Sequence, residues 1–229
     1  MAGELRPFPG RDWRDNVRVG ADAAIAAVPV VGGSLQVLVD AVLAPSLEKR
    51  RDEWMRRLGE VVEELSARLE GFDPSSLSEN EAFVSAVIDA SRIAVGTHLE
   101  EKLEQLKNCL VNLALGRGSG DFLDKQMFRW VDELSPEHFL VMEYLADPRG
   151  WYAAKGVPEQ SFYMGSPMNV LEASGLPIRG NELDIVLSDL GTRRLAHTSS
   201  MGTGMTAQGM WQPLLAPLGQ RLIEFVRLV

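Results

Sequence analysis

The chain has 229 residues, of which 45% are hydrophobic and 24% are charged, and it contains a single cysteine. These fractions are typical of folded proteins and exclude collagen-like and disordered compositions. One cysteine cannot form an internal disulfide, which fits the reducing cytoplasm, and a net charge of −9 argues against broad nucleic-acid binding.

The acidic excess is concentrated in the middle of the chain. Residues 1–57 carry 9 basic and 8 acidic groups, residues 58–133 carry 7 and 15, and residues 134–229 carry 7 and 9. The net charge of the central segment is therefore −8, whereas the two flanks are close to neutral.

Two apolar runs within residues 14–44 flank Pro29 and a Gly32–Gly33 turn, and Ser34 is an N-cap candidate for the second run. This pattern predicts an apolar helical hairpin buried in the core. Each half of its most apolar part, residues 23–44, has about 11 residues, which is too short to span a bilayer alone. Because basic residues stand on both sides of residues 23–44, the alternative is a segment that contacts a membrane after a trigger.

A long amphipathic helix is predicted over residues 46–70, between Pro45 and a C-capping Gly71. Its apolar residues recur at spacings of three, four and seven, which places them on one stripe of an otherwise charged helix. We expect this stripe to bind a protein partner or another copy of the chain. Its central residues are Trp54, Leu58, Val61 and Leu65.

Further helices are predicted over residues 79–133. Ser78 and Glu81 have the spacing of a capping box at the start of the first of them. A second apolar periodicity runs from Glu100 to Leu115, and a Gly-rich connector, residues 116–120, precedes a helix that begins at Asp121. We expect these helices to complete a helical domain over residues 1–133.

The pattern changes after residue 133. Short helices are predicted to begin at Ser135–Pro136, Ser166–Pro167 and Asn181, and the first two are separated by a loop that contains Trp151 and Tyr152. A hairpin-like stretch from Leu195 to Leu215 and a final helix from Pro217 follow.

This order of elements predicts a small winged-helix-like domain with one β-hairpin over residues 134–229. The expected fold class is therefore mainly α, with an N-terminal helical bundle followed by that domain.

No catalytic, cofactor-binding or metal-binding site is predicted. Cys109 lies in the middle of a helix, where nothing supplies the lowered pKa of a reactive thiol, and one cysteine is too few for a zinc pattern. The Gly-rich connector follows a helix rather than the strand that nucleotide-binding loops require. The three histidines lie in different elements: His98, His138 and His197.

DNA binding through the winged-helix-like domain is the more specific alternative, because such modules bind DNA with one helix. In the helix that begins at Asn181, the basic residues are Arg193 and Arg194, both at its end. The wing that would follow has no lysine or arginine, and a phosphate-contacting surface needs several. We therefore expect nucleic acid to be an unlikely partner, with these two arginines as the contacts of the alternative.

Three segments, residues 100–108, 133–142 and 215–223, resemble bacterial helical proteins of the abortive-infection alpha type. The resemblance extends over about residues 80–229 and rests on helix-forming motifs. It implies a helical segment joined to a winged-helix-like end, and a role in phage defence or stress response. It supplies no catalytic residues to transfer.

We therefore expect a non-enzymatic protein-interaction module that binds a protein partner or forms a homo-oligomer. The two alternatives are a DNA-binding transcriptional regulator and a triggered membrane-active protein that uses residues 23–44.

Overall fold

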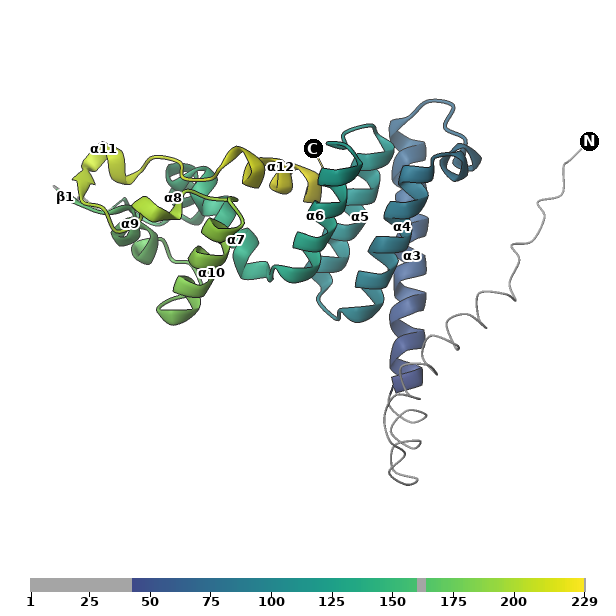
Figure 1. Cartoon of the computed structure of the whole chain (residues 1–229), viewed down its shortest axis with the longest axis horizontal. Coiled ribbons are helices and arrows are strands. Elements are labelled where there is room, and N and C mark those ends of the chain that lie inside the picture. The colour runs from purple at the N-terminus through teal and green to yellow at the C-terminus, as the bar shows by residue number, and fades with distance from the viewer. Residues whose placement is uncertain (1–42, 160–163, 229) are drawn as a thin grey trace, which may run out of the picture. The chain divides into compact units, whose positions relative to one another are not determined.

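The structure is a computed structural model that describes residues 43–159 and 164–228. The chain divides into two units between Lys49 and Arg50, and every contact given below lies within the second unit. The described part is mainly helical with one small antiparallel sheet (Figure 1), which confirms the mainly α fold class. The hairpin predicted over residues 14–44 and the membrane-contacting segment 23–44 fall almost wholly outside the described residues.

The first helices of the described part follow the sequence pattern closely. Helices α4, α5 and α6 pack against one another (Figure 1). The amphipathic helices expected near residues 46–70 and 100–115, and the helix expected from Asp121, are confirmed with ends that shift by two residues or fewer. The elements are α3 (Ala44–Arg68), the 3₁₀-helix η2 (Pro74–Glu79), α4 (Glu81–Gly96), α5 (Glu100–Ala114) and α6 (Asp121–Glu133).

Helix α4 begins with a different cap from the predicted one. Asn80 precedes the helix directly, and its side-chain oxygen accepts a hydrogen bond of 3.0 Å from the backbone N–H of Phe83. Ser78 lies within η2, where its hydroxyl donates to the carbonyl oxygen of Ser75. The predicted capping box was therefore two residues too early, because an asparagine beside the first turn takes the capping position.

The second half of the chain consists of shorter elements. Trp151 and Tyr152, predicted in a loop, lie in α8 instead and are buried. The helix begins there because the Asp147 carboxylate caps it by accepting from the N–H of Gly150. The predicted start at Ser135–Pro136 is confirmed. The helices are α7 (Pro136–Ala146), α8 (Pro148–Lys155), α9 (Pro167–Ala173), α10 (Asn181–Thr192), the 3₁₀-helix η3 (Thr198–Ser200), α11 (Ala207–Met210) and α12 (Pro217–Val226).

The hairpin predicted between Leu195 and Leu215 is wrong in its pairing. Strand β2 (Met205–Thr206) pairs antiparallel with β1 (Met164–Gly165) instead, with Met164 opposite Thr206. Only a bridge between Ala196 and Leu215 joins the two predicted arms. The backbone N–H groups of residues 214 and 215 donate to the carbonyl of Leu145 in α7, so the returning chain is drawn to that helix.

Helix α12 packs on α5 and α7. The side-chain amide of Asn112 in α5 donates to the carbonyl oxygens of Phe225 at 3.0 Å and Arg227 at 2.8 Å, and that of Asn108 donates to Val226 at 3.0 Å. These bonds satisfy carbonyls that a helix C-terminus leaves without partners. They also cross residue 133, where the sequence predicts a domain boundary; that boundary stays a prediction.

None of the helices within the described ranges has an apolar stretch of the length that crosses a membrane.

Candidate functional site

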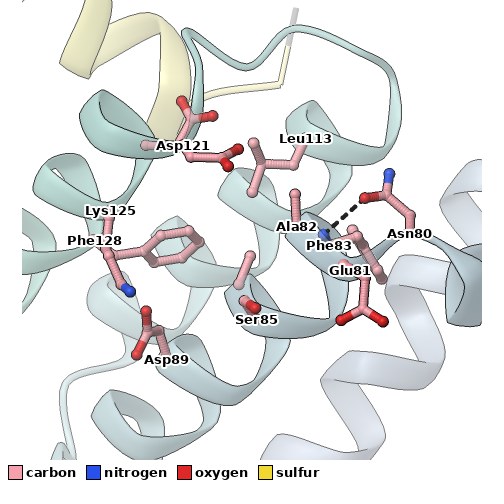
Figure 2. A pocket seen from close by; sticks show the side chains of 12 residues that line it. Asn80, Glu81, Ala82, Phe83, Ser85, Asp89, Leu113, Asp121, Lys125 and Phe128 are labelled. Carbon is pink, nitrogen blue, oxygen red and sulfur yellow. Dashed lines mark hydrogen bonds between the residues drawn. The ribbon is translucent and has the colours of Figure 1, made fainter.

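A groove between α4 and α6 is the candidate site. Two neighbouring cavities, of about 250 and 290 Å³, share Asp89, Lys125 and Phe128 as lining residues. We call the two together the α4–α6 groove, and Figure 2 shows the first of them from close by. Besides the three shared residues, the first is lined by Asn80, Glu81, Ala82, Phe83, Ser85, Ala86, Leu113, Asp121 and Asp124, and the second by Arg92, Ile93, Arg129 and Asp132.

The two helices run in the same direction along the groove. The first cavity is lined by the opening residues of both helices, Glu81 of α4 and Asp121 of α6, and the second by residues nearer their C-terminal ends. Helix α5 holds α6 in place, since the buried ammonium of Lys102 donates to the carbonyl oxygen of Asp132 at 2.6 Å. The groove is therefore built on packed helices rather than on loops.

The floor of the groove is apolar. Phe128 is only 3% exposed, and Phe83, Ala86 and Ile93 of α4 are buried as well. In Figure 2 the Phe128 ring lies between the α4 and α6 side chains that line the first cavity. An apolar floor with polar walls is typical of sites that bind an organic group or an apolar side chain.

Two large apolar side chains are exposed beside this groove. Ile88 of α4 is 65% exposed and Phe122 of α6 is 84% exposed. On a helix, neighbours stand three and four residues apart, so Ile88 lies beside Ser85 and Arg92, and Phe122 beside Lys125. Exposed apolar side chains beside a groove with an apolar floor are found at protein-binding surfaces.

The charges along the groove are unequal at its two ends. Its acidic end, at the start of α4 and α6, carries the carboxylates of Glu81, Asp121 and Asp124. Its basic end, toward their C-termini, carries the guanidinium groups of Arg92 and Arg129 together with the carboxylate of Asp132. Asp89 and Lys125 stand between the two ends, where both cavities meet.

The carboxylates of the acidic end do not gather into a metal centre. Within residues 43–159 and 164–228, the structure brings together no group of three or more side chains of the metal-ligating types. One carboxylate, that of Asp124, accepts a hydrogen bond of 2.8 Å from the backbone N–H of Ser119. This bond ties the Gly-rich connector to the first turn of α6.

The stripe predicted to bind a partner lies inside the protein, which corrects that expectation. Trp54, Val61 and Leu65 are buried, and Leu58 is partly buried against the same core. The indole N–H of Trp54 donates to the hydroxyl of Ser91 in α4 at 2.8 Å. The stripe is occupied by the chain's own helices, because an amphipathic helix buries its apolar face wherever packed neighbours can cover it.

A buried guanidinium group lies on the same face of α3 as this stripe. Arg57 is 3% exposed, and it pairs with Glu53 of its own helix and with Glu100 and Glu104 of α5, the last at 3.1 Å. The three carboxylates are all more exposed than the arginine. This cluster locks α3 to α5.

The two arginines of the nucleic-acid alternative differ from each other. Arg193 pairs with Glu133 at 3.1 Å and with Asp189 at 3.4 Å, so two carboxylates offset its charge. Arg194 is exposed and adopts a left-handed backbone conformation, φ 58°, just after α10. Of the two predicted phosphate contacts, Arg193 is therefore already paired with acidic groups.

Ser135, His138 and Asp189 form a chain of polar contacts. The Ser135 hydroxyl lies 2.9 Å from Nδ1 of His138, and Nε2 of that ring lies 3.5 Å from Oδ2 of Asp189. Nδ1 also accepts the backbone N–H of Ser135, which places the proton of the neutral ring on Nε2. Burial lowers the pKa of His138 below its ordinary value of 6.5, and the nearby Asp189 carboxylate offsets this only in part.

These three residues have a structural role. Ser135 and His138 form the capping box of α7, in which each side chain accepts from the other's backbone N–H. None of the three lines the α4–α6 groove. The capping box accounts for the contacts between the serine and the histidine, and the imidazole's other nitrogen faces Asp189.

Cys109 is fully buried in α5. Burial raises the pKa of its thiol well above the ordinary value, so the reactive thiolate is suppressed.

The sequence did not reveal the groove. Its lining residues come from helices about forty positions apart, and no local motif links them. The one available signal was an apolar excess: Val84, Ile88 and Phe122 stand outside the stripe that each helix needs for its own packing.

Comparison with known proteins finds no family model, no curated protein and no solved structure that matches the chain.

Proposed function

We propose that this chain is a cytoplasmic, non-enzymatic protein-binding module whose binding face is the α4–α6 groove with Ile88 and Phe122 beside it. The observation that carries the proposal is that Ile88 of α4 and Phe122 of α6, the two helices that form the groove, are both exposed. Each exposes apolar area that a protein partner would remove from water, which is favourable. The buried Phe128 floor would add contact area at the centre, where the strongest interface contacts are found.

The resemblance to the abortive-infection alpha type remains a separate prediction. A protein-binding module would fit a defence or stress-response component, because such a role requires recognition and no catalytic group of its own. A winged-helix-like topology for residues 134–229 likewise remains a prediction. A DNA-binding use of that region has little support, since Arg193 is paired with Glu133 and Asp189.

Site-specific photocrosslinking of the full chain in cells of the source organism tests the proposal. A benzoylphenylalanine placed at position 122 should give discrete protein adducts, and the same group at position 185 should not. Ile185 of α10 is a matched control because it is also a large exposed apolar residue, at 62%. The adducts at position 122 should weaken when Ile88→Asp is added. Equal adduct patterns at the two positions, or none at position 122, would rule the binding face out.

A further inference from the structure

The two ends of the α4–α6 groove carry opposite charges, so two copies of the groove facing each other in opposite directions would match in charge. Both helices begin at its acidic end, with Glu81, Asp121 and Asp124, and both carry arginines toward its basic end, Arg92 and Arg129. A two-fold axis that lies in the face, crosses both helices at right angles and passes near Asp89 and Lys125 would put the acidic end of one copy over the basic end of the other. Such an interface is isologous, the commonest arrangement among homo-oligomers.

The two apolar side chains fit the same arrangement. Ile88 lies near the middle of α4, so the rotation would bring it close to its own counterpart. Phe122 lies at the acidic end of α6 and would meet the exposed guanidinium group of Arg129 of the second copy. Arginine packs favourably over an aromatic ring. Arg92, also exposed, pairs with Asp89 of its own helix at 3.2 Å. The dipoles of the facing helices would also run in opposite directions, which is favourable for helices in contact.

We propose that the occupant of the α4–α6 groove is a second copy of this chain, docked antiparallel across the face. The inference rests on the proposed function, because it names the partner of the same surface. A different protein with a mainly basic segment would match only the acidic end, so its binding would be insensitive to the charges of Arg92 and Arg129.

Sedimentation velocity of the full chain with paired charge reversals tests the inference. The wild type should dimerise in a concentration-dependent manner. The double variant Arg92→Glu/Arg129→Glu makes the whole face acidic, and Glu81→Lys/Asp121→Lys makes the acidic end basic. Each alone should weaken dimerisation by about tenfold or more, since like charges would face each other across the two-fold axis.

An equimolar mixture of the two double variants should restore a one-to-one dimer, because the acidic face of one then meets the basic face of the other. This restoration requires both variants to be folded, which far-UV circular dichroism confirms independently. The control variant Glu182→Lys/Asp184→Lys reverses two exposed charges on α10 and should dimerise like the wild type.

A monomeric wild type, a dimer that survives either reversal, or folded variants that fail to combine would each overturn the inference. These outcomes are separate from failure of the proposed function. Crosslinked adducts at position 122 that contain only other proteins would overturn the second copy and leave the binding face standing, whereas the absence of any adduct would overturn both.

Discussion

The ring of Phe128 packs edge-on against the ring of Phe225, with centroids 5.6 Å apart and planes at 83°. Phe128 belongs to α6 and forms the floor of the α4–α6 groove, whereas Phe225 belongs to α12, the last helix of the chain. Edge-to-face pairs of this kind stabilise by more than the area they bury. The groove floor therefore depends on a helix that lies about a hundred residues further along the sequence.

Truncating this floor should destabilise the protein strongly. We expect Phe128→Ala to lower the free energy of unfolding by about 3–5 kcal/mol, because it removes a buried ring and leaves a cavity. Phe122→Ala in the same helix is the matched control and should change it by less than about 0.5 kcal/mol, since that ring is exposed. Urea denaturation of both variants measures the difference. Equal losses of unfolding free energy would contradict the placement of Phe128 in the floor and of Phe122 at the surface.

The amide of Asn112 should hold α12 in place. Asn112→Ala leaves carbonyls at the end of α12 without their buried donor, which should cost about 1–3 kcal/mol. Asn108→Ala, four residues earlier, removes one donated bond and should cost less. Denaturation gives the two free energies, and limited proteolysis should cut near the C-terminus faster in the Asn112 variant. A larger loss of unfolding free energy for Asn108→Ala would contradict the role of Asn112 in holding α12.

The two neighbouring arginines of α3 should behave differently. Arg57→Ala removes a buried side chain that pairs with α3 and α5 carboxylates, and we expect a loss of about 2 kcal/mol in unfolding free energy. Arg56 is exposed and pairs only within its own helix, with Glu53 and Glu60, so Arg56→Ala should cost less than about 0.5 kcal/mol. Thermal unfolding distinguishes the two, and similar midpoints would refute a locking role for Arg57.

Acid should destabilise the protein through His138. Its pKa is lowered by burial in the folded state, so its stabilising contribution is complete above its ordinary value of 6.5 and is lost as pH falls through the lowered pKa. The charged groups around it are Asp189, Glu137 and Arg193. Relative to His138→Gln, the wild type should lose unfolding free energy as pH is lowered from about 7.5 to about 5.

Parallel profiles for the wild type and His138→Gln would show that the buried ring makes no pH-dependent contribution.

The thiol of Cys109 should be unreactive in the folded protein. It is fully buried, and burial raises its pKa, so both access and thiolate formation are suppressed. We expect a disulfide reagent to label it only at the rate of unfolding, and at once in denaturant. Rapid labelling of the native protein would show that α5 opens locally.

Much of the helical architecture could be predicted because its signals are local. The apolar periodicity of α3, the Ser135–Pro136 start of α7 and the Pro217 start of α12 all depend on a few neighbouring residues. The pairing of β1 with β2 could not be predicted in this way. It joins strands of two residues that lie about forty positions apart, and neither strand is long enough to show an alternating pattern.

What an apolar stripe contacts could not be predicted from its spacing. Periodicity places Trp54, Val61 and Leu65 on one side of α3, but it does not tell whether that side meets the chain's own helices or a partner. In the structure α4 and α5 cover it, as the Trp54–Ser91 bond and the Arg57–Glu104 pair show. The apolar residues that remain exposed, Ile88 and Phe122, can be identified only once the packing is known.

Amide hydrogen exchange at different protein concentrations tests most directly whether the α4–α6 face is covered by a second copy. The full chain would be compared at about 1 μM and about 100 μM, where mass action shifts a self-association equilibrium. We predict that exchange in α4 and α6 slows at the higher concentration, whereas exchange in α10 does not change. Unchanged exchange in α4 and α6, or slowing confined to α10, would contradict the account.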